Sequence, residues 1–208
     1  MDMPAPLDEL CELLARVGIS NATKLQQRFE RSLTDGGGSE LAPESRNTLF
    51  LAFLFMNWAI ANGAWSNLTN PRLRQDLMAT SVRVFSHQSA YLLSLSPLQA
   101  DVAYLATTID EQLRTFARNY TRRAGEMEAE GIPTDARSAL LYALEFIQST
   151  LDLPDAVMSS IVPRFLQESE DFAEVESVAF QTNRAAMQRS KLGFWARFVD
   201  GWKRGQDG

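Results

Sequence analysis

The chain has 208 residues, of which 45% are hydrophobic and 22% are charged. These proportions are typical of a globular protein and exclude a wholly disordered chain. The net charge of −6 disfavours nucleic acid as a partner except through a local basic patch. A single cysteine, Cys11, excludes an internal disulfide, and the first seven residues lack the basic and apolar regions of a secretion signal. We therefore expect a cytoplasmic protein.

The first 35 residues predict a pair of short helices. Apolar residues recur at helical spacing from Leu7 to Val17, and Gly18 is typical of a residue that ends a helix. A second helix is then expected after a cap at Ser20. The glycines at 36–38 follow it and predict a flexible joint.

The longest apolar run extends from Leu49 to Ala61 and is interrupted only by Asn57. Thirteen residues are too few to cross a bilayer of about 30 Å, so the run predicts a buried helix. Pro43 is expected to open this helix and Gly63 to close it. The next helix is predicted to start at Asn70-Pro71 and to offer these residues to the core: Leu73, Leu77, Val84, Tyr91 and Leu95.

A long helix is predicted to begin at Ser96-Pro97-Leu98-Gln99, which combines capping-box spacing with proline in the first helical position. From Leu98 to Met127, nine apolar or aromatic positions recur with a mean spacing of 3.6 residues. That spacing is the natural period of a straight helix. If unbroken to Glu130, the helix would be roughly 50 Å long, enough for the spine of a bundle. Residues 131–134 are expected to end it and to cap the next helix.

The remaining sequence predicts further helices. The first of them has an apolar face made by Leu140, Leu144, Ile147 and Leu151 and ends at 152–154. Pro163 is expected to kink or divide the next helical stretch, and a last body helix is expected over 164–189. No segment shows the alternating pattern of a strand.

The predicted fold class is therefore all-α. We expect a multi-helix bundle of about six to eight helices, with one long central helix and an amphipathic C-terminal segment. The sequence divides into an N-terminal helical pair at 1–35, a helical bundle at 43–190 and an amphipathic aromatic and basic tail at 191–208.

The chain offers little that predicts catalysis. His87 is the one histidine, which excludes histidine-based zinc and di-iron sites. Cys11 and His87 would together make a nucleophile and a base, but Cys11 lies among leucines, where a small buried thiol is expected. We predict a protein that is not an enzyme and holds no cofactor and no metal.

Acidic residues gather before the C-terminal region, at Glu168, Glu170, Asp171, Glu174 and Glu176. They lack the loop and glycine spacing of a calcium site, and the preferred interpretation is the solvated side of an amphipathic helix. A second possibility is that this patch receives the basic tail. A helical-bundle enzyme or small-ligand carrier stays open as an alternative function, with lone carboxylates such as Glu145 as its only basis.

Residues 13–24 weakly resemble the turn of a helix-turn-helix DNA reader, with glycine and then an apolar residue at the bend. Lys24 stands where such motifs need an apolar residue. A DNA-binding regulator that uses 7–33, with a ligand-sensing body, is therefore an alternative, and two short helices packed on the bundle are the preferred interpretation.

The most informative segment is the tail. Its apolar residues fall within one arc of about 160° at 100° per residue, and its cations take the other side, except Lys191, which breaks the pattern. The candidate partner-binding residues are Phe194, Trp195, Arg197, Phe198, Val199, Trp202, Lys203 and Arg204. Residues 189–204 contain five cations and one anion, a net charge of +4. Because the whole chain carries −6, the rest of the chain carries −10.

Three arrangements of the tail are open. Its aromatic residues fold back onto the bundle, dock on another protein or subunit, or contact a membrane surface. We predict an adaptor, assembly or regulatory protein that binds a protein partner or itself through this segment, with homo-oligomers plausible and nucleic acid not expected.

Overall fold

The computed structural model describes residues 7–36, 38–66, 70–95, 101–131, 135–168 and 175–188, the last range without residues 183 and 186. Its helices are α1 (Leu7–Asp35), α2 (Pro43–Ser66), α3 (Pro71–Ser94), α4 (Val102–Ala129), α5 (Ala136–Leu151) and α6 (Asp155–Glu168). A further helical segment, here called the 175–188 segment, begins at residue 175. No strand occurs within these ranges. The all-α, multi-helix prediction is confirmed.

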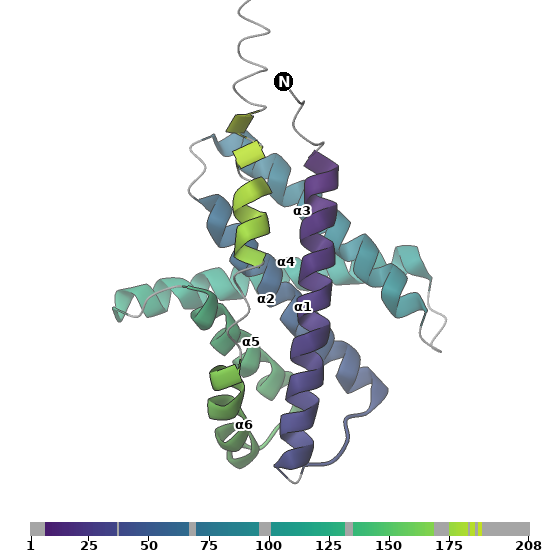
Figure 1. Cartoon of the computed structure of the whole chain (residues 1–208), viewed down its shortest axis with the longest axis vertical. Coiled ribbons are helices and arrows are strands. Elements are labelled where there is room, and N and C mark those ends of the chain that lie inside the picture. The colour runs from purple at the N-terminus through teal and green to yellow at the C-terminus, as the bar shows by residue number, and fades with distance from the viewer. Residues whose placement is uncertain are drawn as a thin grey trace, which may run out of the picture.

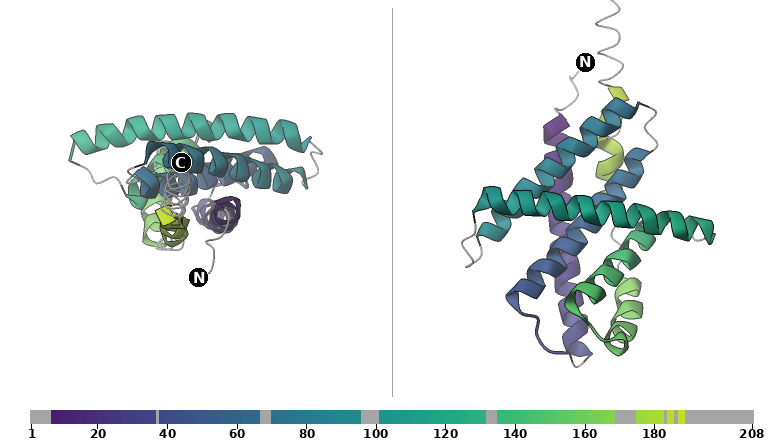
Figure 2. Two further views of the ribbon diagram at one scale, coloured as in Figure 1. Left: turned by 90° about the horizontal axis from the view of Figure 1, so that it is seen from above. Right: turned by 180° about the vertical axis from the view of Figure 1, so that it is seen from behind.

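Helices α1, α2 and α3 form the body of the molecule (Figure 1). α5 and α6 pack at one end of it, and the 175–188 segment lies beside α1 toward the other end. α4 crosses the opposite face from α1 and spans the width of the molecule (Figure 2). The centre of the bundle is therefore α2, which contacts α1, α3, α4 and α5.

α2 occupies the centre because it is apolar on every side. Every side chain from residue 52 to residue 61 is buried, and a helix without a polar face must be surrounded by protein. Phe53 packs against Phe29 of α1 and stacks on Phe165 of α6, with ring centroids 6.3 Å and 5.5 Å away. Phe55 meets Phe116 of α4, with ring centroids 5.7 Å apart.

No helix within the described ranges has a stretch long and apolar enough to cross a membrane.

Asn57, the polar interruption in this helix, is fully buried. Its Oδ1 accepts a hydrogen bond of 2.8 Å from Nδ2 of Asn21 in α1. Its own Nδ2 donates to the carbonyl oxygen of Gly18, at 3.2 Å, and to that of Phe53, at 2.9 Å. Burying an amide without such partners would be costly, so these bonds fix α2 against α1.

The prediction of an N-terminal helical pair is wrong, because α1 runs without a break from Leu7 to Asp35. Gly18 does not end a helix, and the predicted cap Ser20 lies within α1. Close packing of α1 against its neighbours requires a residue without a side chain at this position. A Cβ at residue 18 would lie 3.1 Å from the Phe85 ring of α3 and 3.6 Å from Cβ of Asn57. The helix-turn-helix interpretation loses its turn for the same reason.

Several helix ends differ from those predicted. α2 continues through Gly63 to Ser66. α4 begins at Val102 because the Asp101 side chain accepts hydrogen bonds from the backbone of residues 103 and 104. Residues 96–100, where the start was predicted, lie outside the described ranges. With 28 residues, α4 is roughly 40 Å long.

Other boundaries are confirmed. The side chain of Asn70 caps α3 as predicted. Gly131 follows α4 with a φ of +76°, and Asp152 ends α5 in the left-handed region with a φ of +50°. The cap of α5 is Asp135 rather than a residue of the predicted 131–134 stretch, and it forms a capping box with Ser138.

Pro163 does not divide the chain, since α6 extends through it to Glu168. Proline in a helix interior costs about 3 kcal/mol. The helix continues because its apolar face, which includes Met158, Ile161 and Phe165, is buried in the core. The prediction that a last body helix starts at residue 164 is therefore wrong, because residue 164 lies inside α6. The next described helical residue is Val175.

Replacing Asn57 by aspartate tests the buried amide with almost no change in shape. We expect Asn57→Asp to lower the free energy of unfolding by at least about 3 kcal/mol at pH 7, because a buried carboxylate would face the two carbonyl oxygens that now accept hydrogen bonds. The introduced carboxyl would have a raised pKa in the folded state. The deficit should therefore shrink as the pH falls toward about 4, where the proton returns as a donor.

The measurement is urea unfolding followed by circular dichroism at pH 7 and near pH 4. Asn119→Asp, at an exposed position of α4, makes the same chemical change in water and is the matched control. Equal stability of the two variants at pH 7 would contradict the structural role of Asn57.

Gly18→Ala tests the close approach of α1 and α3. Alanine favours a helix over glycine by about 1 kcal/mol, but overpacking against the buried Phe85 ring should cost about 2 kcal/mol. We expect a net loss of about 1 kcal/mol. Gly125→Ala is the control: a Cβ at residue 125 of α4 would meet nothing within 4 Å, so it should stabilise the protein. Thermal melts that move in the same direction for both variants would show that Gly18 is not constrained by packing.

Candidate interaction surface

The predicted partner-binding residues, from Phe194 to Arg204, lie outside the described residues. Their role therefore stays a prediction. The structure does describe the 175–188 segment, which precedes these residues in the chain. Its packing indicates the direction in which a continued helix would point the apolar face of the tail.

One side of the 175–188 segment packs on the bundle. Val175, Ala179 and Thr182 are fully buried and Val178 is nearly so. The indole Nε1 of Trp65, at the end of α2, donates a hydrogen bond of 3.4 Å to the carbonyl oxygen of Ala179. These residues define the face of the segment that is directed at the bundle.

The opposite side of the segment carries two exposed apolar residues. Phe180 is 58% exposed and Met187 is 44% exposed. At 100° per residue, Met187 lies about 20° from Phe194 around a continued helix, and Phe180 lies about 40° from it. Both fall within the apolar arc of the predicted tail. The exposed apolar stripe therefore begins within the described part of the chain.

In the same helical register, the cations of the tail other than Lys191 would lie on the other side. Arg197 and Arg204 would continue the face that Val175 and Ala179 direct at the bundle. A straight continuation of the helix would consequently turn the tail's aromatic residues away from the bundle. In such a continued helix, the apolar face would change sides near residue 187.

A second apolar surface lies between α1 and α3. It is an open groove of about 520 Å³, lined by Arg16, Ile19, Ser20, His87, Gln88, Tyr91 and Leu92. Tyr91 is 60% exposed and Leu92 41% exposed. The core positions predicted for Tyr91 and Leu95 are wrong, since Leu95 is 67% exposed. The C-terminal part of α3 extends past the body of the bundle, with α4 beside it (Figures 1 and 2).

Sequence analysis missed this groove because α1 and α3 are distant in the chain. The sequence does contain apolar residues at helical spacing that extend the groove. Leu13, which is 40% exposed, precedes Arg16 by one helical turn on the same face of α1. Leu95, at the C-cap of α3, follows Tyr91 by one turn in the same way.

The candidate nucleophile and base do not form a site. Cys11 is fully buried, and burial, together with the charge of Asp8, raises the pKa of its thiol to about 12. His87 is exposed and lines the α1/α3 groove, whose lining does not include Cys11. A reactive cysteine needs an accessible thiolate. The expectation of a buried thiol at Cys11 is confirmed.

The carboxylates offer no metal centre in the described part of the chain. No group of three or more His, Cys, Asp or Glu residues there is arranged to hold a metal ion. Of the predicted acidic cluster, Glu170, Asp171 and Glu174 lie outside the described ranges. Glu145 is not a buried carboxylate: its side chain is 56% exposed and lies 3.7 Å from Arg123.

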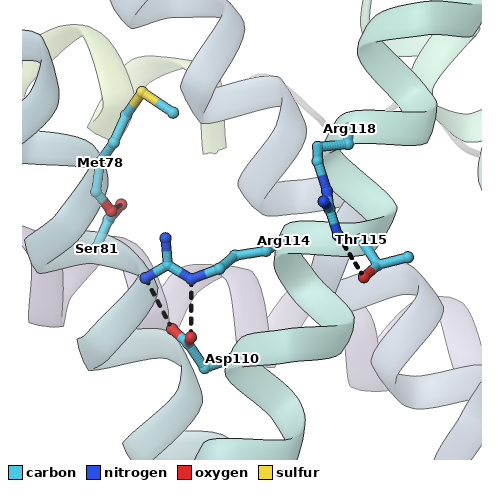
Figure 3. A network of polar contacts seen from close by, with 6 residues as sticks. All are labelled: Met78, Ser81, Asp110, Arg114, Thr115 and Arg118. Carbon is cyan, nitrogen blue, oxygen red and sulfur yellow. Dashed lines mark hydrogen bonds and ion pairs between the residues drawn. The ribbon is translucent and has the colours of Figure 1, made fainter.

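The polar contacts that Figure 3 marks on α4 are local to that helix. Arg114 makes two hydrogen bonds to Asp110 one turn earlier, at 2.8 Å and 3.3 Å, and Arg118 donates to Thr115 at 3.3 Å. The bond to Asp110 raises the pKa of Arg114, which keeps its charge. Pairs of this spacing on an exposed face stabilise a helix and do not make a binding site.

Comparisons with protein-family models, with curated proteins and with solved structures found no match for this chain. The protein is therefore described by its own fold and surface features. It is an all-α helical bundle with an apolar groove and an exposed apolar stripe that leads into its tail.

The state of Cys11 gives a direct check of the packing of α1. We expect the native protein to resist thiol reagents at pH 8, because the raised pKa leaves almost no thiolate and burial blocks access. Absorbance with a disulfide reagent should show no reaction in buffer and one thiol per chain in denaturant. Rapid labelling of the native protein would place Cys11 at the surface, against the structure.

Proposed function

We propose that the protein is a non-enzymatic adaptor, assembly or regulatory protein that binds a protein partner or itself through its C-terminal segment. The observation that supports this most is the exposed stripe of Phe180 and Met187, which shares a helical face with the predicted aromatic residues of the tail.

The energetics favour a covered tail. Each large apolar side chain gains about 1.5–3 kcal/mol when it leaves water. Aromatic and arginine side chains are also the usual anchors of protein interfaces, and an amphipathic helix that lies in an apolar groove is a common mode of recognition. Because a continued helix would turn the aromatic arc away from the segment's own contact face, another surface is the more suitable cover.

The alternatives have less support. The DNA-binding alternative required a turn near Gly18, where α1 is continuous. The ligand-carrier alternative required buried carboxylates, and Glu145 is exposed. A cytoplasmic location remains part of the proposal, because a single buried thiol suits a reducing compartment.

Replacing Trp195, Phe198 and Trp202 by alanine tests the proposal. We expect the triple variant to lose capture of its partner, or self-association, by more than about tenfold, while the helical circular dichroism and the melting temperature stay unchanged. Phe180→Ala with Met187→Ala should weaken binding in the same direction but less, since these residues lie at the edge of the stripe.

Tyr104→Ala is the matched control, because it removes an aromatic residue of α4 that is 70% exposed and lies outside the stripe. A melting temperature that falls in the triple variant but not in this control would indicate that the tail is packed on its own bundle. Flotation with anionic vesicles that the triple substitution abolishes would indicate a membrane surface instead. Either result would contradict the proposal.

A further inference from the structure

The α1/α3 groove has the shape and chemistry of a helix-docking site. Its volume of about 520 Å³ lies within the range of small binding pockets, but it is an open trough between two helices. Ile19, Tyr91 and Leu92 give it mainly apolar walls. Leu13 and Leu95 extend the apolar surface by one turn on each helix. A trough of this kind suits an amphipathic helix with bulky apolar anchors.

From this groove and the phase of the 175–188 segment, we infer that the partner is a second copy of this chain, whose aromatic tail lies in the groove. The inference rests on the proposed function and assigns both the partner and the receiving surface. In a symmetric pair, each copy would supply one tail and one groove, so a single twofold arrangement covers both apolar surfaces of both chains.

A second copy of the chain offers an acidic surface that complements the charge of the tail. The tail region carries +4 and the remainder of the chain −10, so tail and body attract each other. Glu12, whose carboxylate lies 3.4 Å from Arg16 in a half-exposed ion pair, and the exposed Glu9 one turn before it place anions on α1 for the cations of the tail. Arg16, at the rim of the groove, can stack on an indole ring by a cation–π contact.

The geometry disfavours the tail of the same molecule as the occupant. The 175–188 segment lies on one side of α1, and the C-terminal half of α3 lies on the other (Figure 1). The segment also turns Phe180 and Met187 away from the bundle. The groove of a second molecule is not subject to either constraint.

The test uses the purified full chain and measures its mass by light scattering and sedimentation over a series of concentrations. We expect a dimer that dissociates on dilution. Leu92→Glu with Tyr91→Glu, at exposed positions of the groove, should weaken dimerisation by more than about tenfold, and so should the triple tail variant. Tyr104→Glu, at a more exposed site outside the groove, should leave the dimer intact. Circular dichroism melts establish that each variant is folded.

Mixing gives the decisive measurement. The groove variant keeps an intact tail and the tail variant keeps an intact groove, so the mixture should form a heterodimer through one exchange, although neither variant dimerises by itself. Labelled chains in a fluorescence-transfer assay would report it. Failure of the mixture to associate overturns the exchange of tail and groove.

Two other outcomes also overturn the inference. A wild-type chain that stays monomeric at every concentration excludes a second copy; if the tail then still captures a different protein, the proposed function stands without this partner. A monomer that loses thermal stability equally through tail and groove substitutions would show that both belong to one molecule, and that result would remove the proposed function as well.

Discussion

The fold depends on a junction where α1, α2 and α3 meet at Gly18, Asn57 and Phe85. α2 is apolar on all sides, so hydrophobic burial alone does not determine how it is rotated or how far it slides along its neighbours. Asn57 supplies that information, because a buried amide must find its partners, and the Asn21 side chain and the Gly18 carbonyl oxygen meet it in one rotation and one register. The missing side chain at residue 18 then lets the Phe85 ring of α3 approach the same point.

The sequence carries enough information to predict most of the architecture. The 3.6-residue period predicts the buried faces of α4 and α5, where Ile109, Leu113 and Leu140 lie in the core. Capping chemistry predicts the start of α3 and the end of α5. Gly18 could not be predicted in this way, because a glycine that ends a helix and a glycine that admits a neighbouring ring have the same local sequence. Which applies is decided by Phe85, a residue far away in the chain.

The same limit explains what sequence reasoning misses about the candidate site. A periodic apolar pattern shows that a face is to be covered but not by which molecule. Tyr91 and Leu95 continue the apolar periodicity of α3, yet the helix extends beyond the body of the bundle and both side chains are exposed. The groove depends on the packing of α1 against α3, so no single segment encodes it. The tail, by contrast, is local in sequence, and its amphipathic pattern can be predicted without a structure.

The change of apolar face near residue 187 links the rigid body to the proposed docking segment. A helix that served only as the last layer of the core would keep its apolar residues on the side that Val175 and Ala179 direct inward. If this helix continued beyond the described residues, its inward side would become cationic and its outward side, already exposed at Phe180, would become aromatic. Burial on the inward side up to Thr182 anchors the helix, and in the proposed continuation the aromatic residues of the tail would be directed away from that contact. A segment anchored in this way would lose less conformational freedom on binding than an unattached peptide, so a modest groove would suffice to hold it.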